Sequence, residues 1–150
     1  MSDGIRALAL AAVAAGGGLT WMAVRAAWTP IDTPLRAIGE LRLAQVAALL
    51  LACVAGASLG FTAAGDGQTG GGWDVALTAG FLVVASTATL RQPREALTIL
   101  ALAFAAHALI DILHRPEALP TGVTPRWYLV GCASFNLYLG AVCYLPVLRR

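Results

Sequence analysis

Five apolar stretches, each close to the length of a membrane-spanning helix, occupy most of this chain of 150 residues. A bilayer core of about 30 Å needs roughly 20 apolar residues in a helix, and about 17 to 25 are tolerated. The stretches are residues 5–24, 43–64, 73–90, 95–114 and 127–148. Because lipid offers no partner for backbone polar groups, we predict an all-α bundle of five transmembrane helices that forms a single domain over residues 1–150.

The composition excludes a soluble domain and several cofactor chemistries. Hydrophobic residues make up 59% of the chain and charged residues 12%, which leaves too little polar surface for a soluble protein. The sequence contains no lysine, and both retinal and pyridoxal phosphate are held through a lysine Schiff base. The net charge of +2 comes from arginines at the ends of the stretches, so it indicates topology and not nucleic-acid binding.

The arginines also indicate how the stretches are oriented, because an arginine excess marks the cytoplasmic side. One side holds Arg25, Arg36, Arg42, Arg91, Arg94, Arg149 and Arg150, and the other holds Arg6, Arg115 and Arg126. Arginine as the only cation and alanine-rich spans indicate a GC-rich bacterial genome. We therefore predict a bacterial inner-membrane protein with its N-terminus outside and its C-terminus inside. A signal peptide cleaved near Ala15 is the alternative for the first stretch, but its apolar run continues to Val24.

The second stretch has a well-marked start, and the cysteines have a simple interpretation. Thr33-Pro34 is expected to begin a helix that passes Arg36 and Glu40 at the cytoplasmic surface before it enters the membrane. The three cysteines, Cys53, Cys132 and Cys143, contain no C-x-x-C pair. We predict that all three are small buried packing residues.

One polar pattern interrupts the apolar stretches, namely His107-x-x-x-Asp111-x-x-His114. At 100° per residue, the three side chains fall within roughly 60° of one helix face, and Asp111 can reach either histidine. A carboxylate about one turn inside the membrane costs about 2.5 to 3.5 kcal/mol. It should therefore face the interior of the bundle, where neighbouring polar groups can offset this cost.

Three further polar residues are expected at the same outer end. Asn136 on the fifth helix matches the depth of His107, roughly 10–15 Å below the surface. Asp74 opens the third helix and Arg126 opens the fifth. The sequence therefore predicts a polar pocket between the fourth and fifth helices, in the outer half of the bilayer, formed by Asp74, His107, Asp111, His114, Arg126 and Asn136.

Three interpretations of this pocket remain open. The favoured one is a hydrogen-bonded network that locks the fourth helix to the fifth. The second is a metal site for Zn, Fe or Cu with ligands among His107, Asp111 and His114. The two histidines lie about 10.5 Å apart along the helix axis, so one ion would take Asp111 and a single histidine. The third is a pocket for a quinone or lipid-like molecule, whose polar head would bond His107 or Asn136.

The stretch HALIDILHRPEALPTGVTPRWYLVGCASFN, residues 107–136, resembles a family of small multi-pass bacterial membrane proteins. Members carry a histidine, an aspartate and further histidines on the penultimate helix. A proline-rich loop follows, and then a last helix with a small residue or cysteine and an acidic or amide residue. The resemblance covers the C-terminal third and maps onto His107, Asp111, His114 and Asn136. This chain has an amide at position 136, where some relatives have a carboxylate. The family has no assigned activity, so the resemblance implies a fold and a site but no reaction.

We hold three classes of function open. The leading one is a non-enzymatic membrane protein, either an accessory subunit or a ligand-binding protein, whose partners are the bilayer and other membrane subunits or a second copy. The alternative is a metal- or quinone-dependent membrane enzyme, with His107 or His114 as ligand or acid/base and Asp111 as the orienting carboxylate. The third is a small oligomeric transporter or channel. Neither a substrate nor a pathway is indicated by the sequence.

Overall fold

The computed structural model describes residues 3–64, 71–114 and 124–149. These residues form five helices and no strand, so the all-α prediction is confirmed. The helices are α1 (Asp3–Trp28), α2 (Pro34–Ala64), α3 (Gly71–Ala88), α4 (Pro93–Leu113) and α5 (Arg126–Leu148). Each predicted apolar stretch lies in a helix except for the ends of two stretches, because α3 ends at Ala88 and α4 at Leu113. Helix α2 begins at Pro34 as expected. Most of the proline-rich loop in the family resemblance lies outside the described residues.

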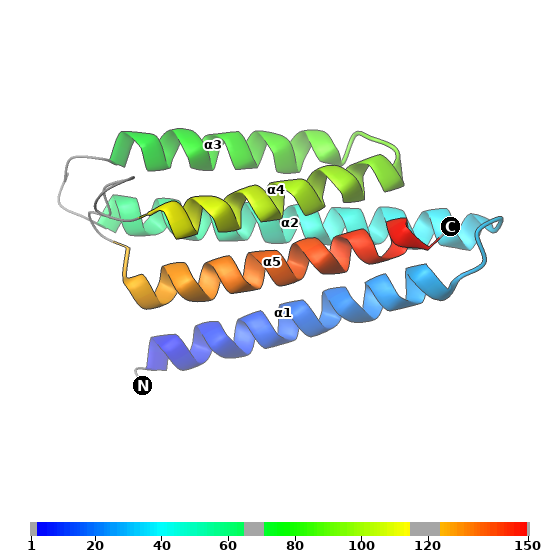
Figure 1. The fold of residues 1–150 in the computed structure, drawn as a ribbon, viewed down its shortest axis with the longest axis horizontal. Coiled ribbons are helices and arrows are strands. Elements are labelled where there is room, and N and C mark those ends of the chain that lie inside the picture. The colour runs from blue at the N-terminus through cyan, green and yellow to red at the C-terminus, as the bar shows by residue number, and fades with distance from the viewer. Residues whose placement is uncertain (1–2, 65–70, 115–123, 150) are drawn as a thin grey trace.

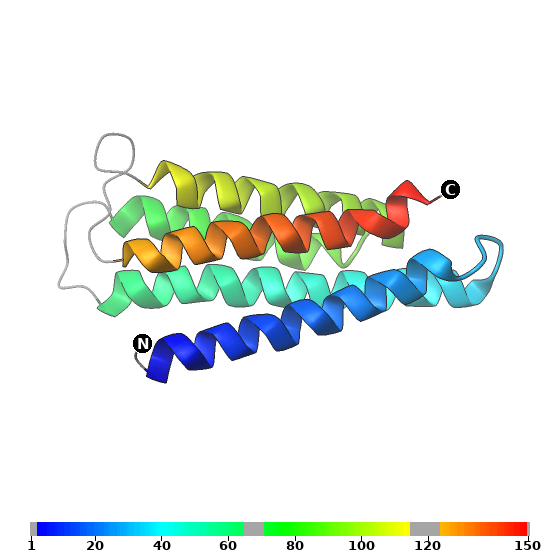
Figure 2. The same cartoon turned by 60° about the horizontal axis from the view of Figure 1, so that its bottom comes forward.

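The helices pack side by side, each antiparallel to the next in the chain, as an elongated bundle (Figure 1). Helix α2 contacts all four other helices, and the most extensive interface joins α4 to α5. Helix α1 lies along the outer edge of the bundle in both views (Figures 1 and 2). The N-terminus and the C-terminus are at opposite ends, so the bundle has an N-terminal end and a C-terminal end (Figure 1).

The interior of the bundle is apolar, and so is much of its outer surface. Fully buried side chains include Leu43, Leu51 and Phe104, whereas Leu10 and Val13 on α1 are 71% and 74% exposed. Helices α1, α2, α4 and α5 are long and apolar enough to cross a membrane. Helix α3 has 18 residues, about 27 Å at 1.5 Å per residue, and is shorter than the other four. Exposed apolar side chains on long helices are typical of a membrane protein.

Helices α4 and α5 approach closely at Gly140, which is buried. A Cβ atom at this position would meet the carbonyl oxygen of Ala101 at 3.1 Å and the Cβ of Phe104 at 3.5 Å. Small residues allow membrane helices to approach in this way, because backbone can then pack against backbone. This close approach brings the polar face of α4 against the polar face of α5.

Arg36 closes the C-terminal end of the bundle. Its side chain is 3% exposed, and every one of its five N–H groups has an acceptor. The Nε atom donates to Glu40 Oε1 at 2.8 Å. The four terminal hydrogens go to backbone carbonyls at 2.8 to 3.2 Å, those of Ala27, Thr29, Pro146 and Arg149. One guanidinium therefore holds the C-terminal ends of α1 and α5 together.

Arg36 and Glu40 are both buried within the bundle, which the sequence did not predict, whereas their position at the level of the cytoplasmic membrane surface stays a prediction. Glu40 is 3% exposed and also pairs through Oε2 with Arg94 Nε at 3.4 Å. The physical reason is that the last carbonyls of a helix have no partner inside that helix. They are also the negative end of the helix dipole, which favours a cation. Two helix ends together thus form a site for a planar, five-donor cation.

Candidate functional site

The predicted polar residues lie toward the N-terminal end of the bundle, but they form two groups there. The first group joins His107 and Asp111 on α4 to Asn136 on α5. The second joins His114 on α4 to Asp74 on α3. Arg126 is exposed at the start of α5 and lines a cavity with Asp111 and His114. The polar residues predicted to share one face of α4 therefore contact two different helices: His107 contacts α5, and His114 contacts α3.

The first group is the most deeply buried polar cluster in the predicted pocket. His107 is 4% exposed, Asp111 is 5% exposed and Asn136 is fully buried. His107 Nδ1 lies 3.3 Å from Asp111 Oδ2 and also 3.3 Å from Asn136 Nδ2. On α3, the ring of Phe81 packs against the imidazole with centroids 4.7 Å apart, which fixes the orientation of the ring.

Cys132 belongs to this cluster, although the sequence predicted it as a packing residue. Asn136 Nδ2 donates to Cys132 Sγ at 3.2 Å, and Cys132 is 8% exposed. The ligand atoms of His107, Asp111 and Cys132 lie within 4.8 Å of one another. The sequence signal that could have assigned Cys132 to the site is its four-residue spacing from Asn136, which places both residues on one helix face. We call His107, Asp111, Cys132 and Asn136 the α4–α5 cluster.

The hydrogen bonds of the α4–α5 cluster are not all satisfied. His107 Nδ1 faces a carboxylate, which accepts, and an amide nitrogen, which donates, so one ring nitrogen cannot serve both in the usual neutral form. In addition, Asn136 Oδ1 is buried without any hydrogen-bond partner among the described residues. Burial of a polar atom without a partner costs about 1 to 3 kcal/mol. A purely structural network would be expected to avoid this cost.

The second group, His114 and Asp74, is fully bonded and shares a proton. His114 Nδ1 lies 2.9 Å from the carbonyl oxygen of Ile110, which can only accept, so Nδ1 carries a hydrogen. His114 Nε2 lies 2.8 Å from Asp74 Oδ1. A hydrogen must lie between these two atoms as well, either on the ring nitrogen or on the carboxyl group. The pair therefore ties the end of α4 to the start of α3.

Two cavities flank the α4–α5 cluster. A cavity of about 300 Å³ lies on the side of Asp111, and its walls include His114, Arg126 and Ser134. A second cavity of about 410 Å³ lies between α1, α2 and α5 and is lined almost entirely by apolar side chains. Cys132 forms part of its wall. The cluster thus separates a partly polar cavity from an apolar one.

The chain matches no family model, no curated protein and no solved structure. The resemblance to small multi-pass bacterial membrane proteins stays a prediction from the residues that carry it. The site residues likewise stand on their chemistry and geometry.

Proposed function

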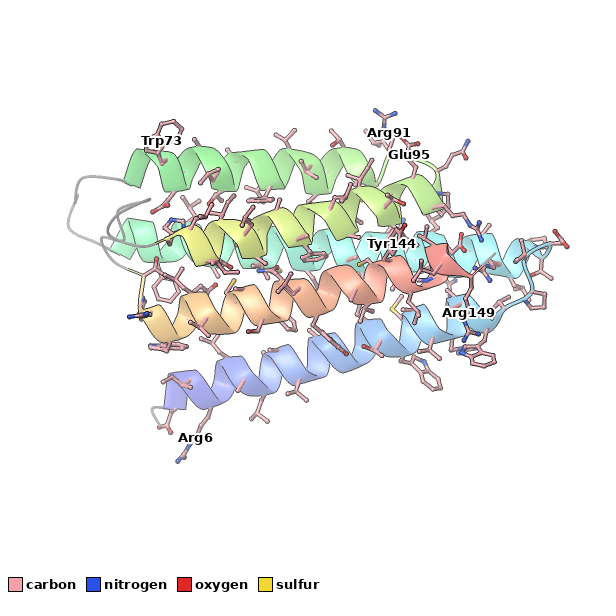
Figure 3. The ribbon with its side chains drawn as sticks, in the orientation of Figure 1. Arg6, Trp73, Arg91, Glu95, Tyr144 and Arg149 are labelled. Atoms are coloured by element: carbon pink, nitrogen blue, oxygen red, sulfur yellow. The ribbon has the colours of Figure 1, made fainter. Side chains whose placement is uncertain are left out.

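We propose that the chain crosses a bacterial inner membrane five times, with the N-terminus outside. The arginine distribution supports this orientation. Arg6 lies at the N-terminal end, the end that Trp73 also marks, whereas Arg91 and Arg149 lie at the C-terminal end (Figure 3). Arginine-rich ends face the cytoplasm. Helix α3, about 27 Å long, spans by this proposal with the help of local thinning of the bilayer.

Orientation is tested by fusing a reporter to the C-terminus. A fluorescent protein that matures only in the cytoplasm should be bright, and an alkaline phosphatase that is active only outside should be silent. The opposite pair of results would contradict the N-out topology.

We further propose that the protein is a ligand-binding membrane protein whose site is the α4–α5 cluster. The observation that carries this proposal is the fully buried Oδ1 of Asn136, which has no hydrogen-bond partner among the described residues. Two other members of the cluster, Asp111 and Cys132, each line one of the two cavities. A ligand that offers a donor or a positive charge would complete the bonds that the cluster lacks. Asp111 forms part of the wall of the partly polar cavity, so a ligand from the outer side has a route to the cluster.

The distribution of buried polar groups supports binding in preference to conduction. Among the described residues, the buried charged side chains form two groups near opposite ends, Arg36 with Glu40 and His107 with Asp111. Between these groups lie apolar side chains such as Leu51, Leu100 and Leu139, all fully buried. A single chain therefore offers a polar site near one surface, which suits a binding protein or an accessory subunit.

Native mass spectrometry of the protein in mild detergent tests the binding proposal. We expect a bound mass in the wild-type protein that is lost in His107→Leu. The matched control is Thr98→Val on the same helix, which removes only a hydroxyl group bonded to the carbonyl of Arg94 and lies outside both cavities. A wild-type protein without any bound mass, or a bound mass that persists in His107→Leu, would show that the cluster is only a structural network.

A further inference from the structure

We infer that the ligand of the α4–α5 cluster is a divalent transition-metal ion of the zinc type, and this inference rests on the proposed binding function. One ring nitrogen of His107, one carboxylate oxygen of Asp111 and Cys132 Sγ converge from two helices within 4.8 Å of one another. Imidazole, carboxylate and thiolate are the three side-chain ligand types of zinc sites, at about 2.0 to 2.3 Å from the ion. Cys132 thus adds a third ligand to the single histidine and Asp111 that the sequence predicted for one ion.

Asn136 supplies the fourth ligand. Its Nδ2 atom now lies 3.3 Å from His107 Nδ1 and 3.2 Å from Cys132 Sγ. Rotation of the amide by half a turn places Oδ1, which has no partner, where Nδ2 lies. Four lone-pair atoms then surround one point. Ligand atoms in a tetrahedral zinc site lie about 3.3 to 3.8 Å apart. The contacts of 3.2 and 3.3 Å in the cluster are close to this range, and the pairs that lie within 4.8 Å draw closer when the ion binds.

The charges of the cluster favour a divalent ion over other cations. A thiolate at Cys132 and a carboxylate at Asp111 carry two negative charges, while His107 and Asn136 bind as neutral ligands. A divalent ion therefore gives a neutral site, which avoids the large cost of a net charge in a low-dielectric interior. The soft thiolate also selects zinc-like ions over Mg²⁺ and Ca²⁺, which prefer oxygen ligands.

The surroundings of the cluster provide both support and an entry path. Phe81 packs on the His107 ring with the centroids 4.7 Å apart and holds the ring in place. The cavity of about 300 Å³ reaches Asp111 from the side of His114 and Arg126. Arg126 is exposed, so water and salt screen its charge at the mouth of this cavity.

Titration of the chelator-treated protein with Co²⁺, in mild detergent and without a histidine tag, tests this inference. We expect one Co²⁺ per chain, with the visible absorption of a tetrahedral ion and a thiolate-to-cobalt charge-transfer band that Zn²⁺ abolishes. Cys132→Ser and His107→Leu should lose the charge-transfer band, and Asn136→Leu should weaken binding at least tenfold. The matched control is Cys143→Ser, which removes a second buried cysteine of α5 and should leave the spectrum unchanged.

The possible outcomes distinguish a failure of the metal inference from a failure of the proposed binding function. An aqueous, octahedral Co²⁺ spectrum with wild-type protein overturns the metal inference whether or not the variants fold. A charge-transfer band that persists in Cys132→Ser overturns the proposed ligand set. If wild-type protein binds no Co²⁺ but native mass spectrometry finds an organic molecule that depends on His107, the binding function stands and the metal fails. If neither binds, both proposals fail.

Discussion

Replacement of Arg36 by alanine is expected to lower the free energy of unfolding by about 3 to 5 kcal/mol, the usual cost of removing one partner of a buried ion pair. The change leaves the carboxylate of Glu40 with only its longer contact to Arg94. It also strands four carbonyls at the C-terminal ends of α1 and α5. Thermal unfolding in detergent, followed by tryptophan fluorescence, measures the loss.

The matched control is Arg91→Ala, because Arg91 and Glu95 form an exposed pair with the same four-residue spacing. Their side chains are 59% and 50% exposed, so we expect a change below about 1 kcal/mol. The loss of stability in Arg36→Lys should lie between those of Arg36→Ala and Arg91→Ala, since an ammonium group offers three donors in place of five. Equal melting temperatures for Arg36→Ala and Arg91→Ala would contradict the role assigned to Arg36.

Gly140→Val is expected to destabilise the protein by about 1 to 3 kcal/mol, the typical cost of overpacking a core. The added Cβ would lie 3.1 Å from the carbonyl oxygen of Ala101, which belongs to a rigid helix backbone. Helices α4 and α5 must then move apart, and the contact of 3.3 Å between His107 and Asn136 must lengthen. The variant should therefore also lose the ligand of the α4–α5 cluster, which native mass spectrometry detects.

Gly131→Val on the same helix is the control for this prediction. A Cβ at Gly131 would meet nothing within 4 Å, so we expect a stability change within about 0.5 kcal/mol and normal ligand binding. A similar loss of stability in both variants would point to the helix preferences of valine, and not to the close approach of α4 and α5.

The helices could be predicted from the sequence because their apolar stretches are long and separated by short polar segments. The bounds differ mainly at α1, which continues beyond the predicted end at Val24 to Trp28. The burial of Arg36 could not be predicted, because it depends on carbonyls at the ends of two other helices. From the sequence alone, a charged residue outside an apolar stretch is predicted to lie at the surface. Only the folded arrangement of those helix ends shows that Arg36 is buried.

The site could be predicted in outline only. The spacing of His107 and Asp111 and the depth of Asn136 follow from helix geometry, and the structure brings these residues together. The pairing of His114 with Asp74 depends on the position of α3, which the sequence does not give. Cys132 was missed because a cysteine in an apolar helix has no distinctive pattern, and only the facing side chains of α4 give it a chemical role.

The bonds of Arg36 also impose an order on biosynthesis. Its partners Pro146 and Arg149 follow it by 110 and 113 residues. While the ribosome is still making α3 and α4, the nascent chain already contains Arg36 but does not yet contain these two acceptors. The C-terminal end of the bundle can close only after α5 has been inserted. A nascent chain that stalls before α5 therefore leaves two of the five N–H groups of Arg36 without these acceptors.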